Sequence, residues 1–332
     1  MRLYCFVPLL PILILHVHRS ASYKILIFSP RVGYSHVNYF GQIADILVEA
    51  GYDVVVYLVN MDPDVHSNGT RLARVVEDSH SPFLLETKNL NKRIWHNDGG
   101  SVLEIYKVRF TAFYTNNVLK NDKVLEYLRS EKFDLGITEA ISFCGYRIFE
   151  KIGLKTYITG FTSNLVEIIS DKLGVSSNPS YIPESSEAWV RIYLDENMIE
   201  SVGRSSFAFV NSEELLEFPR LLSHKIVYIG GVAVEKPKPL NEDYGKLMDA
   251  AADGAVLISF GSVAKSVLMT DQQKDAFCNA FKAFPKVKFI WKYEINDSVA
   301  TDLPNVFKGN WIPQTDFLGN FYFYAVFAAM QC

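Results

Sequence analysis

The sequence KILIFSPRVGYSHVNYFGQIADILVEAGYDVVVYLV, residues 24–59, decides the fold. Residues 24–28 form an apolar run, residues 29–36 have the composition of a loop, residues 37–50 repeat apolar side chains at helical spacing, and residues 53–59 form a second apolar run. Parallel strands that are buried on both faces give such near-continuous apolar runs. The pattern therefore predicts a β-loop-α-β unit, whose ligand site lies where the first strand ends and the helix begins.

His36 stands at that point of the unit. An imidazole has an ordinary pKa of about 6.5 and can accept a proton at neutral pH, and we expect the strand-to-helix loop to leave it exposed to a ligand. A histidine in such a loop is also an ordinary cap or surface residue. A carboxylate that orients its ring would favour a catalytic role.

A second β-loop-α-β rhythm supplies such a carboxylate. Residues 133–138 are predicted as a strand, residues 141–151 as a helix and residues 154–159 as another strand. Glu139 then falls at the carboxyl end of a strand, on the same edge of the sheet as His36. By itself an acidic residue at a strand end is more often solvated than catalytic.

The length of 332 residues exceeds the usual size of one hydrophobic core and predicts two domains. We place an N-terminal α/β domain at residues 23–231, a linker rich in proline and charge at residues 232–243, and a C-terminal α/β domain at residues 244–332. The C-terminal domain is expected to begin with a helix and a strand, followed by a helix that opens with the capping box Thr270 to Gln273, and a further strand. These elements are predicted at residues 244–252, 255–260, 270–284 and 287–293.

The other segments of the N-terminal domain give weaker signals. Residues 60–100 are polar and irregular, which is typical either of a loop region on the substrate side of the domain or of an ordinary exposed surface. Residues 102–128 show helical spacing of apolar and aromatic side chains, either as an ordinary core face or as part of an acceptor pocket. A loop is expected at residues 176–186, a helix at 186–202 and strands at 207–211 and 227–231.

The composition is that of a folded globular protein, with 49% hydrophobic and 21% charged residues and a formal net charge of -4. This balance gives no basic footprint, so we expect no nucleic-acid partner. Of the four cysteines, Cys144 and Cys278 are expected to be small buried hydrophobic residues, because no spacing indicates a metal site or a disulfide framework.

The first residues have the features of a targeting segment. An apolar run at residues 3–17 follows Arg2, and small residues at 20–22 offer a cleavage site. Residues 1–22 are therefore predicted as a secretory signal peptide, which places the protein in the endoplasmic reticulum lumen or at its membrane. The sequons that begin at Asn68 and Asn296 agree with this route.

Two further motifs could hold an anionic or nucleotide ligand. In Phe260-Gly261-Ser262, the glycine lets the backbone approach closely and the hydroxyl can donate to a phosphate, although strand-glycine-serine turns are also common without a ligand. Trp311 and Gln314 could offer a stacking plane and an amide to a nucleobase, or they could form a turn around a buried tryptophan. Neither a P-loop nor a G-x-G-x-x-G fingerprint is present, which argues against an NTPase or a dehydrogenase.

In this order, the motifs resemble the UDP-glucuronosyltransferases of the UDP-glycosyltransferase family, in particular its nematode-type members. The resemblance is carried by Phe28-Ser-Pro-Arg31, Ser35-His36, Phe133-Asp134 with the acid Glu139, Phe209-Val-Asn211-Ser212, Ile229-Gly-Gly231, Phe260-Gly-Ser262 and Trp311-Ile-Pro-Gln314-Thr-Asp316. It runs to about Gly319. It implies the GT-B glycosyltransferase architecture of two Rossmann-like domains, with the acceptor in the N-terminal domain and the UDP-sugar mainly in the C-terminal one.

The same resemblance implies the chemistry. His36 matches the family's catalytic base, which takes the proton of a small lipophilic acceptor hydroxyl as the hydroxyl attacks the anomeric carbon with inversion. Glu139 falls where many relatives have an aspartate that pairs with this base. Ser262 matches a phosphate-contacting serine, and Trp311 and Gln314 open the signature that cradles the uridine. The implied donor is UDP-glucuronate or another UDP-sugar, with neither metal nor cofactor.

The sequence departs from the family pattern after Gly319. The histidine-containing donor signature, the remaining elements of the C-terminal domain and the family's C-terminal membrane anchor are not recognised in residues 320–332, so we interpret the C-terminal domain as truncated. Two hypotheses follow. The chain is either an active transferase, or a catalytically inactive product that binds the acceptor or associates with full-length relatives as a homo- or hetero-oligomer.

Overall fold

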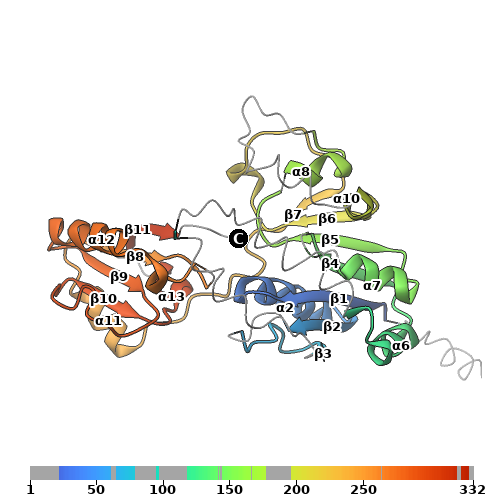
Figure 1. The fold of residues 1–332 in the computed structure, drawn as a ribbon, viewed down its shortest axis with the longest axis horizontal. Helices are drawn as coiled ribbons and strands as arrows, with labels where there is room; N and C mark the ends of the chain where they lie inside the picture. Colours follow the sequence, from blue (N-terminus) through green and yellow to red (C-terminus); the bar gives the residue numbers. More distant parts are fainter. Residues whose placement is uncertain are drawn as a thin grey trace, which may run out of the picture.

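A computed structural model describes residues 22–60, 65–78, 95–96, 118–140, 142, 144–165, 167–176, 196–262, 264–319 and 323–328. Figure 1 shows two sheets, the first drawn in blue to yellow and the second in orange to red. The predicted signal peptide, most of the predicted helix at residues 102–128 and the predicted loop at 176–186 lie mainly outside the described residues.

The first sheet has seven parallel strands in the order β3-β2-β1-β4-β5-β6-β7. The strands are β1 (Lys24–Arg31), β2 (Asp53–Asn60), β3 (Arg74–Asp78), β4 (Leu135–Glu139), β5 (Tyr157–Phe161), β6 (Phe207–Val210) and β7 (Ile226–Tyr228). The helices of this part are α2 (Tyr34–Glu49), α6 (Asp122–Glu131), α7 (Cys144–Ile152), α8 (Glu167–Ser170) and α10 (Glu196–Gly203), with short 3-10 turns at Asp171–Leu173 and Glu214–Leu216. The strand order reverses between β1 and β4, which is the point where open α/β sheets bind ligands.

Both faces of β1 are buried. Leu26 and Phe28 join the core cluster on one face of the sheet, and Ile25 and Ile27 join the cluster on the other face together with Val37 of α2. Because side chains alternate across a strand, burial of both faces requires apolar residues at successive positions. This is the physical reason for the apolar run at residues 24–28, and the β-loop-α-β unit predicted from it is present.

Helix α2 begins three residues earlier than the sequence predicted. Gly33 is its N-cap, in extended conformation and without a side-chain cap bond, so Tyr34, Ser35 and His36 form the first turn. His36 was predicted in an exposed loop, and that prediction is wrong: the residue is helical and only 2% exposed. The first turn carries no apolar repeat of its own, so periodicity alone could not extend the helix to it.

Residues 69–72 pack against α2 at Gly41 and bind its Asp45 side chain through hydrogen bonds. Glycine is required on both sides of this contact, because a Cβ on Gly41 would lie 2.0 Å from the carbonyl oxygen of Gly69. Gly69 itself has a φ of +75°, in the left-handed region. One helical turn further on, the buried carboxylate of Asp45 accepts hydrogen bonds from the Thr70 hydroxyl and, at 3.0 Å, from the backbone N–H groups of Arg71 and Leu72.

These bonds make the contribution of Asp45 to stability dependent on pH. Burial opposes ionisation of the carboxyl, but the hydrogen bonds from Thr70, Leu72 and Arg71 outweigh it and hold its pKa below the ordinary value. Replacing Asp45 with asparagine should therefore lower the free energy of unfolding by about 2 kcal/mol at neutral pH. A carboxyl with a lowered folded-state pKa contributes stability above its unfolded pKa and loses that contribution as the pH falls through its folded pKa.

The difference between the wild type and Asp45→Asn should accordingly shrink below about pH 4, which urea denaturation across the acid range measures. Glu49→Gln is the matched control, because Glu49 is an exposed acid on the same helix, and it should change stability by less than about 0.5 kcal/mol. A destabilisation by Asp45→Asn that stays constant with pH would contradict the assignment.

Several elements of the first sheet differ from the prediction in their bounds. Strand β3 lies in the region expected to be irregular, where it pairs in parallel with β2 at the edge of the sheet. Helix α6 begins at Asp122, because Asn121 is its N-cap and the Asn121 side chain accepts a hydrogen bond from the backbone N–H of Val124.

The two cysteines that were predicted to be buried differ in exposure. Cys144 is buried as predicted, and burial raises the pKa of its thiol. Cys278 is only half-buried.

The second sheet has four described strands, all parallel, in the order β10-β9-β8-β11. The strands are β8 (Ala255–Ser259), β9 (Lys288–Lys292), β10 (Val306–Gly309) and β11 (Phe323–Ala328), and the helices are α11 (Glu242–Asp249), α12 (Asp271–Ala283) and α13 (Gln314–Leu318). The predicted capping box of α12 is confirmed, with both the Thr270 and Gln273 bonds formed. Strands β10 and β11 were not predicted, and β11 pairs in parallel with β8.

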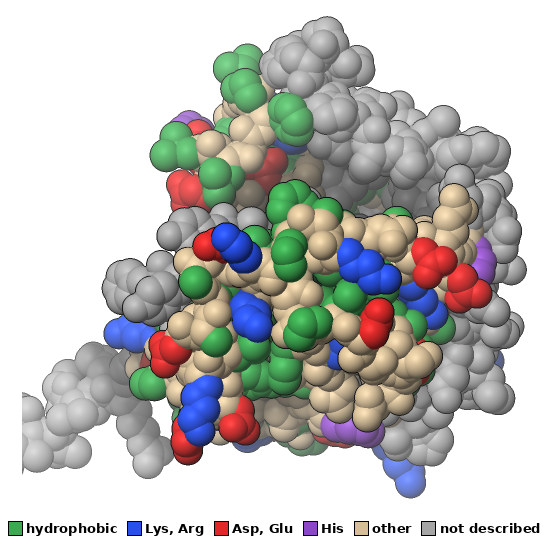
Figure 2. Space-filling view, turned by 90° about the vertical axis from the view of Figure 1, so that its left-hand side faces the viewer, with side chains coloured by type: hydrophobic (Ala, Val, Ile, Leu, Met, Phe, Trp, Pro, Cys, Tyr) green, Lys and Arg blue, Asp and Glu red, His purple; other side chains and the backbone are tan. Residues whose placement is uncertain are grey.

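The surface of the second domain carries charges of both signs. Figure 2, which faces this domain, shows Lys and Arg side chains interspersed with Asp and Glu side chains. Ion pairs between Lys246 and Glu242 and between Lys308 and Asp297 belong to this pattern. On the described part of this face, no large patch of one charge sign is seen. Across the described ranges, no helix combines the length and the apolarity that crossing a bilayer requires.

Candidate active site

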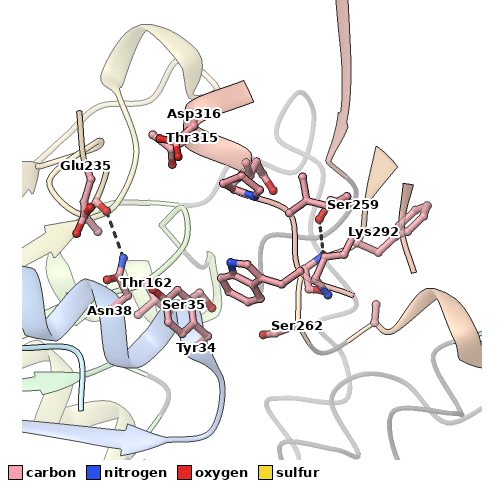
Figure 3. A pocket seen from close by; sticks show the side chains of 18 of the residues that line it. Tyr34, Ser35, Asn38, Thr162, Glu235, Ser259, Ser262, Lys292, Thr315 and Asp316 are labelled. Carbon is pink, nitrogen blue, oxygen red and sulfur yellow. Dashed lines mark hydrogen bonds between the residues drawn. The ribbon is translucent and has the colours of Figure 1, made fainter. Parts of the chain in front are cut away.

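A cavity of about 480 Å³ lies between the two domains. Figure 3 shows Tyr34, Ser35 and Asn38 on one wall and Ser259, Ser262 and Lys292 on the facing wall. The first wall comes from the start of α2, and the second from the ends of β8 and β9. Both walls are therefore built at the carboxyl ends of parallel strands, where the loops of α/β sheets present polar groups.

His36 and Glu139 are in direct contact. The Nδ1 atom of His36 lies 2.7 Å from Oε2 of Glu139, and both side chains are buried. Thr162, which follows β5, donates from Oγ1 to Oε1 of Glu139 at 3.1 Å and lies 3.3 Å from Nδ1 of His36. A buried carboxylate needs such partners, because an unpaired charge is costly in a low dielectric.

This arrangement fixes the orientation of the imidazole ring. If Nδ1 carries the proton and donates it to the Glu139 carboxylate, Nε2 is left as the basic atom, which is the general arrangement of a histidine base with an acidic partner. His36 does not itself line the cavity, but its neighbours Ser35 and Thr162 do. The site thus holds the histidine just beneath the cavity wall rather than in open solvent.

Tyr39 lies one turn along α2 from His36 and is also buried. Burial, together with the nearby Glu139 carboxylate, raises the pKa of Tyr39 well above its ordinary value. Within the described ranges its hydroxyl has no hydrogen-bond partner. The hydroxyl therefore stays protonated at neutral pH.

The loop after β8 forms the opposite wall. Gly261 has a φ of +77°, in the left-handed region, which turns the chain so that Ser262 lines the cavity. The Nζ atom of Lys292 donates to the carbonyl oxygen of Gly261 at 2.9 Å and to Oε1 of Glu294 at 3.0 Å. We call the segment formed by Phe260, Gly261, Ser262, Ala264 and Lys265 the phosphate loop, after the contact predicted for Ser262.

Trp311 and Gln314 complete the same cavity. Trp311 is 54% exposed and lines the cavity, so the alternative of a turn around a buried tryptophan is wrong, and the stacking plane stays a prediction. Its ring meets the ring of Tyr34 edge to face, with centroids 5.3 Å apart. Gln314 is the first residue of α13. The structure therefore brings Ser262, Trp311 and Gln314 together around one cavity. Tyr34, which lies two residues before His36 in the chain, lines the same cavity.

The linker between the domains is attached on both sides of the cavity. Nδ2 of Asn38 donates to the carbonyl oxygen of Ala233 at 3.2 Å, and the backbone N–H of Lys238 donates to Oδ1 of Asp316 at 2.8 Å. Gly319 packs so closely on Pro237 that a Cβ there would lie 2.3 Å from the proline ring. These contacts join α2 and α13 through the linker.

Sequence reasoning missed several polar residues of the site, among them Thr162 and Lys292. Thr162 follows a strand two positions from β1 in the sheet, so the rule that selected Glu139 at the end of β4 would also have selected it. Lys292 gave no signal, because it stands at the end of an apolar strand and resembles an exposed terminal lysine. In the part of the chain that the structure describes, no three His, Cys, Asp or Glu side chains are grouped to hold a metal ion.

Comparisons with known proteins identify similar sequences. Residues 189–326 match the family model described as UDP-glucoronosyl and UDP-glucosyl transferase. The chain is 25% identical to a Caenorhabditis elegans protein named UDP-glucuronosyltransferase ugt-55, over 90% of this chain and 66% of that protein. It is 26% identical to rat 2-hydroxyacylsphingosine 1-beta-galactosyltransferase, over 90% of this chain and 61% of the rat protein. The chain thus spans less than two thirds of the length of these relatives.

Solved structures show the same fold. Phytolacca americana UGT2, complexed with UDP-2fluoro-glucose and pterostilbene, superimposes with a TM-score of 0.59 at 15% identity, over 92% of this chain and 75% of that one. Arabidopsis thaliana UGT89C1, complexed with UDP-L-rhamnose, gives a TM-score of 0.59 at 14% identity, over 92% and 74% of the two chains. The predicted GT-B architecture of two Rossmann-like domains is confirmed.

Proposed function

Because the chain belongs to the family of UDP-glucoronosyl and UDP-glucosyl transferases, we propose that it transfers a sugar from a UDP-sugar to the hydroxyl of a small lipophilic acceptor. One observation carries the proposal. The His36–Glu139 pair lies directly beneath a cavity whose opposite wall presents Ser262, Trp311 and Gln314. A base on one side and candidate nucleotide-binding groups on the other are what a two-substrate displacement requires.

His36 serves as the general base in this proposal. Nε2 takes the proton of the acceptor hydroxyl while Nδ1–H stays hydrogen-bonded to Glu139, whose carboxylate stabilises the imidazolium that forms. The acceptor oxygen forms a bond to the anomeric carbon as the bond from that carbon to the UDP oxygen breaks. The bonding electrons leave with UDP, and attack from the opposite face inverts the configuration of the sugar.

The second domain holds the donor. The Ser262 hydroxyl and the backbone N–H groups of the phosphate loop donate to the diphosphate, where negative charge increases as UDP departs. Trp311 offers a ring for the uracil to stack on, and Gln314 offers an amide to its polar edge. Lys292, which is ion-paired with Glu294, lines the same wall. These donors supply the charge stabilisation in this proposal, which assigns no role to a metal ion or another cofactor.

The relatives support the substrate classes. The name of the nematode relative supports glucuronic acid as the transferred sugar, and that of the rat relative, a galactosyltransferase named for an acylsphingosine, supports a lipophilic acceptor. We further place the protein in the secretory pathway, as a glycoprotein of the endoplasmic reticulum. Asn68 and Asn296, which begin the two sequons, are exposed, as glycosylation would require.

UDP binding tests the donor half of the proposal. Titration calorimetry with UDP should give a saturable heat, and Trp311→Ala should weaken the affinity by about tenfold, because stacking on an aromatic ring contributes about 1–3 kcal/mol per base. Phe284→Ala is the matched control, since Phe284 is an exposed aromatic residue just past the end of α12 and does not line the cavity. The control should bind UDP as the wild type does.

The outcomes separate the two hypotheses. No heat with UDP in the wild type would refute the donor half. Transfer to a panel of phenols and sphingoid alcohols, followed with UDP-glucuronate, UDP-glucose and UDP-galactose, tests the whole reaction. UDP binding without transfer to any acceptor would instead favour the catalytically inactive alternative, which pull-down with a full-length relative would then examine.

A further inference from the structure

Trp95 lies in the sequence of the first domain but packs against the core of the second domain. In sequence it lies between β3 and α6, which are parts of the first domain. In space its ring joins the core of the second domain, where it meets the ring of Phe260 edge to face with centroids 5.0 Å apart. A residue from the first half of the sequence therefore packs in the core of the second domain.

Trp95 contacts the phosphate loop at both of its ends. The ring lies against Phe260 at the start of the loop, and the indole Nε1–H donates to the carbonyl oxygen of Lys265 at its end, at 2.8 Å. Ser262 stands between these two points. A short segment that is fixed at both ends has little freedom left in the middle, so Trp95 limits the positions that the Ser262 hydroxyl can take.

The backbone of Trp95 is held by the helix that follows the loop. The side-chain amide of Gln273 accepts from the N–H of Thr270 at 2.9 Å and donates through Nε2 to the carbonyl oxygen of Trp95 at 3.2 Å. The residue that closes the capping box of α12 thus also fixes Trp95. An accidental surface contact would not use the indole N–H, the ring and the backbone carbonyl together.

The ring contact extends into the core of the second domain. Phe260 meets Phe277 at 5.9 Å between centroids, and Phe277 in turn meets Trp291 at 5.6 Å. Trp291 donates through Nε1 to the Ser266 hydroxyl at 3.2 Å, directly beyond the loop. Aromatic pairs contribute beyond the area they bury, and Trp95 extends this series of ring contacts to the phosphate loop.

We propose that Trp95 is a positioning residue for the donor, supplied by the acceptor-side half of the chain, which holds Ser262 in place to meet the diphosphate of the UDP-sugar. The assignment of the diphosphate rests on the proposed function. The positioning of the loop does not, because the contacts that fix it are all made between residues of the protein. Two measurements, one of the loop and one of the nucleotide, therefore test the inference separately.

The first measurement is hydrogen exchange of the full-length chain without nucleotide. Trp95→Ala should speed the exchange of amides in the phosphate loop and in the first turn of α12 by about tenfold, while Trp95→Phe, which keeps the ring but loses the N–H donor, should give a smaller increase of about threefold. Val287→Ala serves as the control, because Val287 packs in the same core cluster away from the loop. Unchanged exchange of the loop in Trp95→Ala would overturn the inference.

The second measurement is the affinity for UDP by calorimetry. Trp95→Ala should weaken UDP binding by about tenfold and raise the donor KM, with little change in kcat or in the acceptor KM, and Trp95→Phe should restore most of the affinity. Val287→Ala should lower the melting temperature without changing UDP affinity. Faster loop exchange with no UDP binding in the wild type would leave the positioning of the loop intact and refute the donor assignment. Equal UDP affinity in Trp95→Ala and the wild type would refute the role of Trp95 in donor binding.

Discussion

Replacing His36 with alanine should lower kcat for sugar transfer by about 10³-fold, the usual contribution of a positioned general base. Nδ1 of the imidazole contacts both Glu139 and Thr162, so these two side chains hold the ring in the orientation that the proton transfer needs. UDP affinity should stay within about twofold, because His36 does not line the cavity in which the donor groups lie. Steady-state kinetics and UDP calorimetry on the same preparation measure the two effects.

Substitution of Glu139, the partner of His36, should lower kcat by a smaller factor than His36→Ala. Glu139→Asp keeps the charge but shortens the arm, which breaks the 2.7 Å contact to Nδ1 and should cost about tenfold in kcat. His224→Ala is the control, because His224 is an exposed histidine of the same domain. Full activity in His36→Ala would exclude this histidine as the base.

Replacing Gly41 with alanine should destabilise the protein by about 3 kcal/mol or more, the range of severe overpacking. The added Cβ would lie 2.0 Å from the carbonyl oxygen of Gly69 and 2.1 Å from its carbonyl carbon. Neither atom can move away easily, since Gly69 occupies left-handed backbone geometry and packs against Val37 of the same helix. A fall in melting temperature of roughly 6–12 °C is expected.

Gly245→Ala is the matched control for this substitution. Gly245 also lies within a helix, α11, but a Cβ there would meet no atom within 4 Å. Alanine should therefore stabilise that helix by about 0.5–1 kcal/mol, because it loses less backbone freedom than glycine on folding. Equal stability of Gly41→Ala and the wild type would show that residues 69–72 give way without cost and do not hold α2.

The sequence predicted those parts of the fold whose signal is local. The apolar runs of β1 and β2 are direct consequences of burial on both faces, and the Thr270 capping box is a fixed chemical pattern. Glu139 was found because the carboxyl end of a parallel strand can be located from the strand itself. The start of α2 was misplaced because Gly33 caps the helix without a side-chain bond, so no polar cap marked it.

Features that depend on distant partners could not be predicted. Strand β3 contains Arg74, Glu77 and Asp78 and is a strand because β2 offers it an edge to pair with. Lys292 acquires its role from the Gly261 carbonyl, 31 residues away, and Trp95 from Lys265, 170 residues away. Such long-range contacts leave no periodicity in the sequence around them.

The two domains contact each other at three described places. One is the ring pair of Tyr34 and Trp311 across the cavity. The linker is bonded to α2 at Ala233 and to α13 at Lys238, and Trp95 attaches the region between β3 and α6 to the second domain. Any opening of the cavity that releases UDP is therefore expected to separate the Tyr34 and Trp311 rings, because they lie on its two facing walls.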